Sequence, residues 1–138
     1  MATDKERNKR LIKTYGITLE EYNQMLQEQG GCCQICKKIP EVGAKSLHVD
    51  HCHKHKYVKL VSLKTDDLWT VSCNYRDRLV TANGKKINDV KKEVRQKLKK
   101  LSVRGLLCFC CNRGLRLWFD NYDNMYSAAC YLKTFSGK

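Results

Sequence analysis

Apolar residues recur at helical spacing in the first part of the chain. Thr18 and Glu21 have the spacing of a capping box, and Gly30-Gly31 marks the end of the apolar pattern that follows them. The pattern predicts a helix over about residues 19–29 that buries one apolar stripe. That stripe consists of Leu19, Tyr22, Met25 and Leu26. The basic segment before it, residues 1–15, ends in apolar residues and indicates a short helix.

The pattern changes to alternation at residues 47–52, which predicts a short strand with Leu47 and Val49 on one face. Side chains along a strand point alternately to its two faces, so Asp50 and His51 are expected on opposite sides. If both residues serve one site, the chain must bend or leave the strand there.

Residues 57–101 have a pattern of their own. Apolar and polar residues alternate over residues 69–76, which predicts a strand, and Asn83-Gly84 predicts a turn that closes a hairpin with residues 79–81. Apolar residues then step by three and four, at Ile87, Val90, Val94, Leu98 and Leu101. This spacing predicts an amphipathic helix, and its opposite face is basic. A basic face is typical both of a solvated surface and of a helix that follows a DNA backbone.

Two elements of the C-terminal part are predicted from apolar spacing and caps. Residues 103–107 read as a second core strand, and residues 112–119 as a short helix with three side chains inward, Leu115, Trp118 and Phe119. Asp123 is expected to cap a last helix. Its buried line is expected to consist of Met125, Ala129 and Leu132.

Length and charge narrow the possible functions. The 138 residues are enough for one domain with an insertion, and 27 Lys and Arg against 14 Asp and Glu give a formal charge of +13. Such a charge attracts polyanions, so nucleic acid is the leading partner, although some basic proteins are merely soluble. Residues 1–10 are charged and no apolar run is long enough to span a membrane. We therefore expect a cytoplasmic protein with no membrane partner.

Cysteine spacing predicts a metal site. The number of cysteines, nine, is odd, and two pairs have the Cys-x-x-Cys spacing of zinc ligands rather than the arrangement of a disulfide scaffold. The pairs are Cys33 with Cys36 and Cys108 with Cys111, which together predict a structural four-thiolate zinc site. Cys32 and Cys110 are rival ligands by adjacency. The remaining three, Cys52, Cys73 and Cys130, are expected to be small buried residues.

All four histidines lie close to Asp50 in the sequence, at His48, His51, His53 and His55. A carboxylate can hold a hard cation, and a neutral imidazole can take a proton near neutral pH. Asn112 directly follows the last zinc cysteine, so the zinc would bring its amide beside Asp50 and His51. The alternatives are a polar strand end, or a second zinc site that uses His51 and His53.

Several linked motifs resemble one known family. They are Tyr-Gly-Ile-Thr-Leu-Glu-Glu-Tyr at residues 15–22, Gln-Gly-Gly-Cys-Cys-Gln-Ile-Cys at 29–36, Val-Asp-His-Cys-His at 49–53 and Val-Arg-Gly-Leu-Leu-Cys-Phe-Cys-Cys-Asn-Arg-Gly-Leu at 103–115. In this order they are similar to the phage recombination endonuclease VII family, which belongs to the His-Me finger, or HNH-like ββα-metal, nucleases. The resemblance covers residues 11–56 and 102–133.

The resemblance implies an α+β fold with a zinc-stabilised ββα-metal core and flanking helices. Residues 1–56 and 102–138 would form that core, and residues 57–101 would be a basic β-hairpin-plus-helix insertion in place of the family's short loop. Zinc would bind the four paired cysteines.

The resemblance also implies roles for the site residues. Asp50 and Asn112 would bind a catalytic magnesium, with manganese as a possible substitute. His51 would be the general base, and His53 would contact the scissile phosphate.

The function implied is a metal-dependent DNA endonuclease that leaves 5′-phosphate and 3′-hydroxyl ends, either nicking or homing in type or junction-resolving. It would act in the host cytoplasm if the gene is a phage gene, and a homodimer is possible. The alternative is a non-catalytic zinc-dependent DNA-binding module. Basic residues expected to contact DNA are Lys91, Lys92, Arg95, Lys99 and Arg104.

Overall fold

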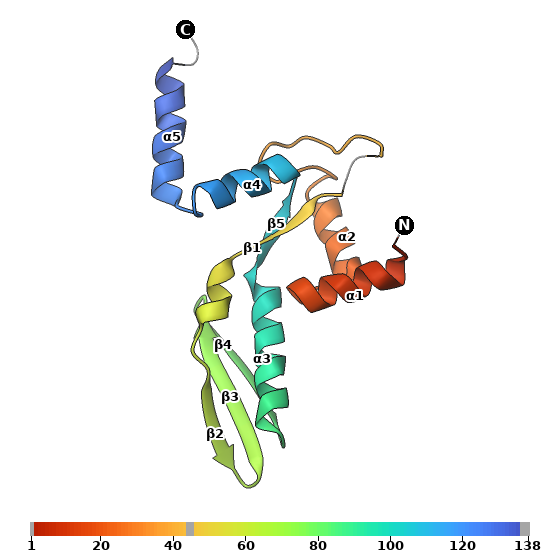
Figure 1. Ribbon diagram of the computed structural model, residues 1–138, viewed down its shortest axis with the longest axis vertical. Helices are drawn as coiled ribbons and strands as arrows, with labels where there is room; N and C mark the ends of the chain where they lie inside the picture. The colour runs from red at the N-terminus through yellow and green to blue at the C-terminus, as the bar shows by residue number, and fades with distance from the viewer. Residues whose placement is uncertain (1, 44–45, 136–138) are drawn as a thin grey trace.

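Helices and two separate antiparallel sheets make up the protein, and the computed structural model describes residues 2–43 and 46–135 (Figure 1). The mixed α+β class is the one predicted. In chain order the elements are α1 (Asp4–Tyr15), α2 (Leu19–Glu28), β1 (His48–His51), the 3-10 helix η1 (His53–Tyr57), β2 (Val61–Thr65), β3 (Leu68–Tyr75), β4 (Arg78–Gly84), α3 (Ile87–Ser102), β5 (Val103–Leu107), α4 (Phe109–Leu117) and α5 (Tyr122–Phe135).

The smaller sheet, at the centre of Figure 1, joins parts of the chain that are far apart in sequence. β1 pairs antiparallel with β5, with His48 opposite Leu107 and Asp50 opposite Gly105. The register shifts between Asp50 and His51, as at a β-bulge, which changes the direction of the side chains after it. The strand is therefore irregular at the point where a site shared by Asp50 and His51 would require it. α4 follows β5 and contacts both strands.

One hydrophobic cluster holds this sheet against the N-terminal helices. Its buried members are Ile17, Tyr22, Cys33, Leu47, Val49, Leu106 and Leu107. The predicted capping box of α2 is confirmed, because Thr18 Oγ1 accepts from the Glu21 amide and Glu21 Oε2 accepts from the Thr18 amide. Tyr22 donates its hydroxyl hydrogen to the Leu47 carbonyl at 2.6 Å, so the helix is tied directly to the segment that leads into β1.

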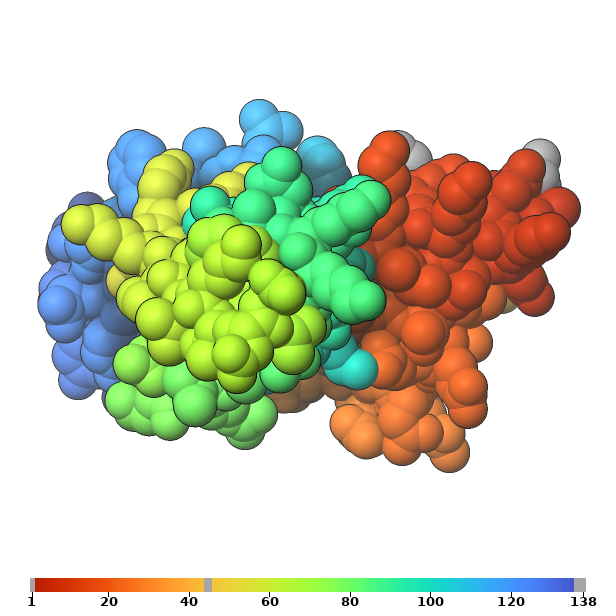
Figure 2. Space-filling model, turned by 90° about the horizontal axis from the view of Figure 1, so that it is seen from below, coloured from red at the N-terminus to blue at the C-terminus, as the bar shows by residue number. Residues whose placement is uncertain are grey.

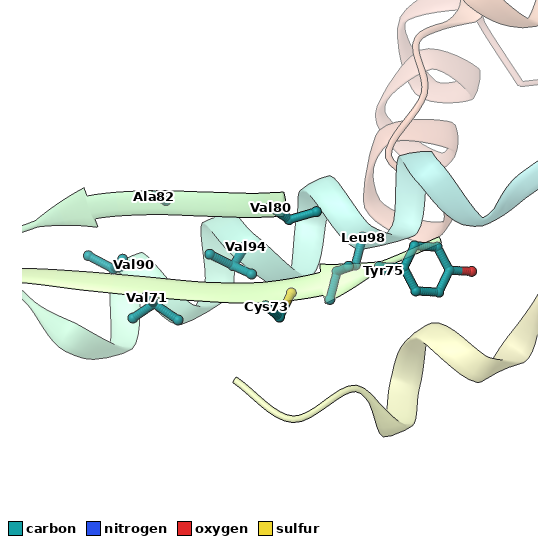
Figure 3. Close-up of a cluster of buried hydrophobic side chains, with 8 residues drawn as sticks. All are labelled: Val71, Cys73, Tyr75, Val80, Ala82, Val90, Val94 and Leu98. Atoms are coloured by element: carbon teal, nitrogen blue, oxygen red, sulfur yellow. The ribbon is translucent and has the colours of Figure 1, made fainter. Parts of the chain in front are cut away.

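A second hydrophobic cluster lies wholly within residues 57–101, between α3 and the sheet of order β2-β3-β4 (Figure 3). Its buried side chains are Val71, Cys73, Tyr75, Val80, Ala82, Val90, Val94 and Leu98. The amphipathic helix is confirmed, because its predicted apolar stripe is the face that packs on the sheet. This segment therefore has a core of its own, made by its strands and helix together.

The predicted hairpin turn is wrong. Asn83 and Gly84 end β4 and pair with Thr70 and Trp69, while the turn between β3 and β4 is made by residues 76–77. Both turn residues have positive φ, 53° and 61°, and Asp66 and Asp67 close the preceding hairpin with φ of 49° and 63°. Asp tolerates this conformation more readily than most residues, but Arg does not, so nothing in the local sequence marks the turn as strongly as Asn-Gly does.

The predicted short helix after the second zinc pair needs correction at both ends. α4 begins at Phe109 rather than at residue 112, because Cys108 precedes it as the cap and its Sγ accepts from the Cys111 amide at 3.4 Å. The helix ends at Leu117, so Trp118 and Phe119 do not continue its inner face and are 46% and 91% exposed.

The last helix also differs from its prediction. Asn121 rather than Asp123 caps it, with Asn121 Oδ1 accepting from the Asn124 amide at 3.0 Å. α5 contains no buried residue, so the expected line of Met125, Ala129 and Leu132 is not a core. In Figure 1, α5 extends away from the rest of the molecule, which explains why its apolar positions are not covered.

α3 also connects the two hydrophobic clusters. It lies against α1, seen as the green and red surfaces in Figure 2, and Lys99 Nζ donates to the Lys13 carbonyl at 3.0 Å. Gly16, at φ 74°, makes the close approach possible, because a Cβ there would lie 2.9 Å from the Gln96 carbonyl oxygen. Among residues 2–43 and 46–135, no helix has both the length and the apolar character that crossing a membrane requires.

Candidate active site

The four paired cysteines come together as predicted. Their Sγ atoms all lie within 4.8 Å of one another, and those of Cys36 and Cys108 are 3.8 Å apart. A tetrahedral zinc ion with bonds of about 2.3 Å holds its sulfurs about 3.8 Å apart, so the cluster has the dimensions of a structural zinc site. The site joins the loop after α2 to the start of α4.

The thiols of the cluster differ in how readily they ionise. Burial opposes ionisation of Cys33, but hydrogen bonds from backbone amides, that of Cys108 first, lower its pKa to about 6. Burial and the neighbouring thiols raise the pKa of Cys111 to about 12. Zinc binds cysteines as thiolates, so a zinc ion in this cluster would have to displace the remaining thiol protons.

The other cysteines are not part of the cluster. Cys32, one rival ligand, donates its thiol hydrogen to the Gln29 carbonyl, and Cys110, the other, is exposed. Cys73 is buried as predicted, whereas Cys52 is half-buried and Cys130 is exposed, because α5 packs on no core.

A cavity of about 790 Å³ lies between β1, β5, α4 and the α4–α5 link. All four predicted catalytic residues line it, namely Asp50, His51, His53 and Asn112. β1 supplies the first two on either side of its bulge, and the first turns of α4 supply Asn112 just after the zinc cysteines. The structure therefore brings together residues that are more than fifty positions apart.

His51 is held among aromatic rings. Its ring centroid lies 5.2 Å from that of Tyr15, edge to face, and 4.4 Å from that of His53. Burial, followed by the charges of His53 and nearby basic groups, lowers the pKa of His51 to about 4, although Asp50 opposes the shift. The imidazole is therefore neutral near pH 7 and able to accept a proton.

The neighbouring histidines have different environments. His53 is exposed at the cavity. The partial burial of its ring, followed by the charge of Lys56, lowers its pKa. His55 is buried, and its Nδ1 lies 2.7 Å from the Cys52 carbonyl oxygen. His55 is therefore part of the structure that supports the site rather than part of its surface.

Arg104 occupies a position that the sequence did not indicate. Its contact with DNA stays a prediction, and in the structure its Nε donates to Asp50 Oδ2 at 2.7 Å and its Nη2 to Asp50 Oδ1 at 2.9 Å. The same Nη2 donates to Asp120 Oδ1 at 3.3 Å, and the pairing with Asp50 raises the pKa of Arg104 further. Knowledge that β1 pairs with β5 would have placed Arg104 near Asp50. The contact of Arg104 with Asp120 depends also on where α4 ends, and no local sequence pattern shows that end.

The other four residues predicted to contact DNA divide into two groups. Lys91 and Lys92 are exposed on α3. Arg95 donates to the His55 carbonyl at 3.3 Å, and Lys99 is engaged with α1 as described above. Only the first two therefore present their charges freely to solvent within this group.

Residues 8–134 match the family described as recombination endonuclease VII. The chain belongs to this family. Over 50 residues it is 46% identical to the Gene 59 protein of Mycobacterium phage L5, and equally so to the protein of that name in Mycobacterium phage D29. Each match covers 36% of this chain and 30% of the relative, so the chain spans less than a third of the length of these phage relatives. No solved structure matches this member of the endonuclease VII family.

Proposed function

We propose that this protein is a magnesium-dependent endodeoxyribonuclease that hydrolyses phosphodiester bonds to 5′-phosphate and 3′-hydroxyl ends. The observation that carries the proposal is that Asp50, His51 and Asn112 line one cavity in a chain of an endonuclease family. In this proposal β1, β5 and α4 are the ββα-metal, or His-Me finger, unit. The cysteine cluster holds the first turn of α4 in place, with zinc as a structural ion.

The proposed general base is His51. Its neutral imidazole takes a proton from a water molecule as that water attacks the phosphorus, in line with the departing 3′ oxygen. The ring contact with Tyr15 limits how the imidazole can turn. His53, exposed beside it, is suited to contact a phosphate oxygen.

Asp50 and Asn112 are the proposed magnesium ligands, with manganese as a substitute. Magnesium prefers oxygen ligands, which a carboxylate and an amide supply. Arg104 uses two of about four lone-pair positions on the Asp50 carboxylate, so the carboxylate keeps capacity for a cation. When bound, the ion would offset negative charge that develops on the phosphate and the leaving oxygen.

A second candidate function is a non-catalytic zinc-dependent DNA-binding module. The observation that favours it is the double hydrogen bond from Arg104, which gives Asp50 a structural partner without any metal. The two candidates differ in one measurable respect, because only the nuclease requires magnesium to bind at Asp50 and Asn112.

The remaining parts of the proposal concern partners. DNA is the proposed substrate, either a site for nicking or homing or a branched junction, and Lys91 and Lys92 are the proposed contacts from the insertion. Residues 1–56 and 102–138 form the proposed nuclease core, and residues 57–101 the inserted unit. The phage relatives support a phage gene, and action in a host cytoplasm is proposed on that basis, together with a possible homodimer.

The test is cleavage by His51→Ala, with magnesium, of supercoiled plasmid and of a synthetic four-way junction. Wild type should cut at least one substrate and leave ends that ligate, whereas the variant should bind DNA but lose cleavage by about 100-fold or more. His48→Ala is the matched control, because His48 lies on the same strand but does not line the cavity. Cleavage by His51→Ala at the wild-type rate would contradict the mechanism.

A further inference from the structure

Phe119 is an exposed aromatic residue at the edge of the proposed active site. It lies in the link between α4 and α5, is 91% exposed, and lines the same cavity as His51 and Asn112. Its position beside these residues, rather than its exposure alone, makes it a candidate for contact with the substrate.

The backbone at Phe119 is unfavourable for its residue type. Its φ is 53° and that of Asp120 is 54°, a left-handed conformation that favours glycine. The Phe119 amide donates to the Arg116 carbonyl and the Asp120 amide to the Leu115 carbonyl, both at 3.0 Å, which closes the end of α4 in the manner usual for a glycine. A phenylalanine here gains little from burial, so the strain indicates a function outside the folding of the chain.

The link that carries Phe119 is fastened to the site. Asp120 accepts a hydrogen bond from Arg104, which also holds Asp50. The residue that directly follows Phe119 is thus joined through one guanidinium group to the carboxylate proposed to bind magnesium. This arrangement keeps the backbone of Phe119 close to the proposed site of cleavage.

The charge around the cavity indicates what Phe119 contacts. Lys54 and Arg116 are exposed and line the cavity together with Phe119. Basic side chains beside an exposed aromatic ring are the combination that binds single-stranded nucleic acid, in which the charges hold phosphates and the ring stacks on a base. This charge pattern favours DNA over a second copy of the same basic chain.

We propose that Phe119 stacks on an unpaired base next to the scissile phosphate and thereby selects DNA whose base stacking is interrupted. The proposal rests on the proposed nuclease function and assigns the selection of such DNA to one residue. A base in an intact duplex must first be unstacked before a ring can contact its face, whereas a base at a bulge or branch is already accessible. The enzyme should therefore prefer interrupted DNA to a perfect duplex.

The experiment measures binding of the zinc-loaded full chain to two synthetic DNAs without magnesium, so that cleavage does not interfere. One is a duplex with a single unpaired 2-aminopurine, and the other is the same duplex fully paired. Wild type should bind the first DNA more tightly, and its binding should change the 2-aminopurine fluorescence. Phe119→Leu should reduce that preference by about tenfold and abolish the fluorescence change, with little effect on the paired duplex.

Three variants serve as controls. Phe119→Gly should lose the preference while relieving the backbone strain, so a folding defect cannot explain its result. Phe119→Trp should keep the preference, because it retains a stacking surface. Tyr126→Leu replaces an aromatic residue that is 61% exposed but does not line the cavity, and it should behave as wild type.

The outcomes separate this proposal from the one on which it rests. If wild type cuts DNA but Phe119→Leu keeps the full preference and fluorescence change, the role of Phe119 is overturned and the nuclease stands. If Phe119→Leu changes only the oligomeric state in sedimentation, the residue belongs to a protein interface and the proposal is wrong. If wild type neither binds nor cuts either DNA, the proposed function itself fails.

Discussion

Arg104 binds both carboxylate oxygens of Asp50, at 2.7 and 2.9 Å, across the two strands of the smaller sheet. The Asp50 side chain is 10% exposed and that of Arg104 is 29% exposed, so the carboxylate is more deeply buried than the guanidinium group. Loss of the arginine would leave a largely buried carboxylate without its partner. The pair therefore matters for stability whether or not a metal binds.

Arg104→Met should lower the free energy of unfolding by about 2 kcal/mol, less than for a fully buried pair because Arg104 is partly solvated. The measurement is urea denaturation of the zinc-loaded protein without magnesium. Lys100→Met is the matched control, since it breaks the exposed pair with Glu21 and should cost less than about 1 kcal/mol. Equal losses in both variants would show that the contact with Asp50 has no special weight.

Removal of zinc should unfold the smaller sheet, β1 with β5, and the helices that pack on it. The cysteines join the loop after α2 to α4, and metal binding energy at such a site is folding energy. A strong chelator, or Cys111→Ser, should lower the melting temperature and release close to one zinc ion per chain by metal analysis. Cys130→Ser, at an exposed cysteine outside the cluster, should change neither quantity.

The parts of this architecture that were predicted are those specified locally. The capping box of Thr18 and Glu21, the apolar stripe of α3 and the paired cysteines each need only a few neighbouring residues to define them. The presence of Asn112 in one cavity with Asp50 and His51 follows from the same reasoning, because a metal that joins the cysteines would bring Asn112 toward β1.

The features that the sequence did not predict are of two kinds. Some depend on tertiary contacts, and others on backbone conformations that the residue type disfavours. Arg76 adopts a positive φ in the hairpin turn, and Phe119 does so at the end of α4, where each replaces a residue type that would have marked the turn. The contact of Arg104 with Asp120 requires both the strand pairing and the end of α4 to be known. No spacing in the sequence contains that information.

Stability should depend on pH through His51. Its pKa is about 4 in the folded protein, against about 6.5 for an unfolded chain, so between these values the unfolded state binds more protons. The contribution of His51 should therefore be constant above about pH 6.5 and fall as pH decreases toward 4. The free energy of unfolding, measured by denaturation at several pH values in this range, should change less with pH in His51→Gln than in wild type. The same pH dependence in both proteins would contradict the assigned environment of His51.

DNA affinity should depend on the two exposed lysines of α3. Lys91→Ala with Lys92→Ala should weaken binding to all DNA sequences and reduce the slope of log affinity against log salt by about 0.9 for each phosphate that a lysine no longer neutralises. Lys97→Ala is the control, because Lys97 Nζ is already engaged with the Thr81 carbonyl at 2.9 Å and lies near Glu93. Binding measured from low to moderate salt separates the two cases. An unchanged slope in the double variant would mean that α3 does not contact the DNA backbone, and that the insertion acts through another surface.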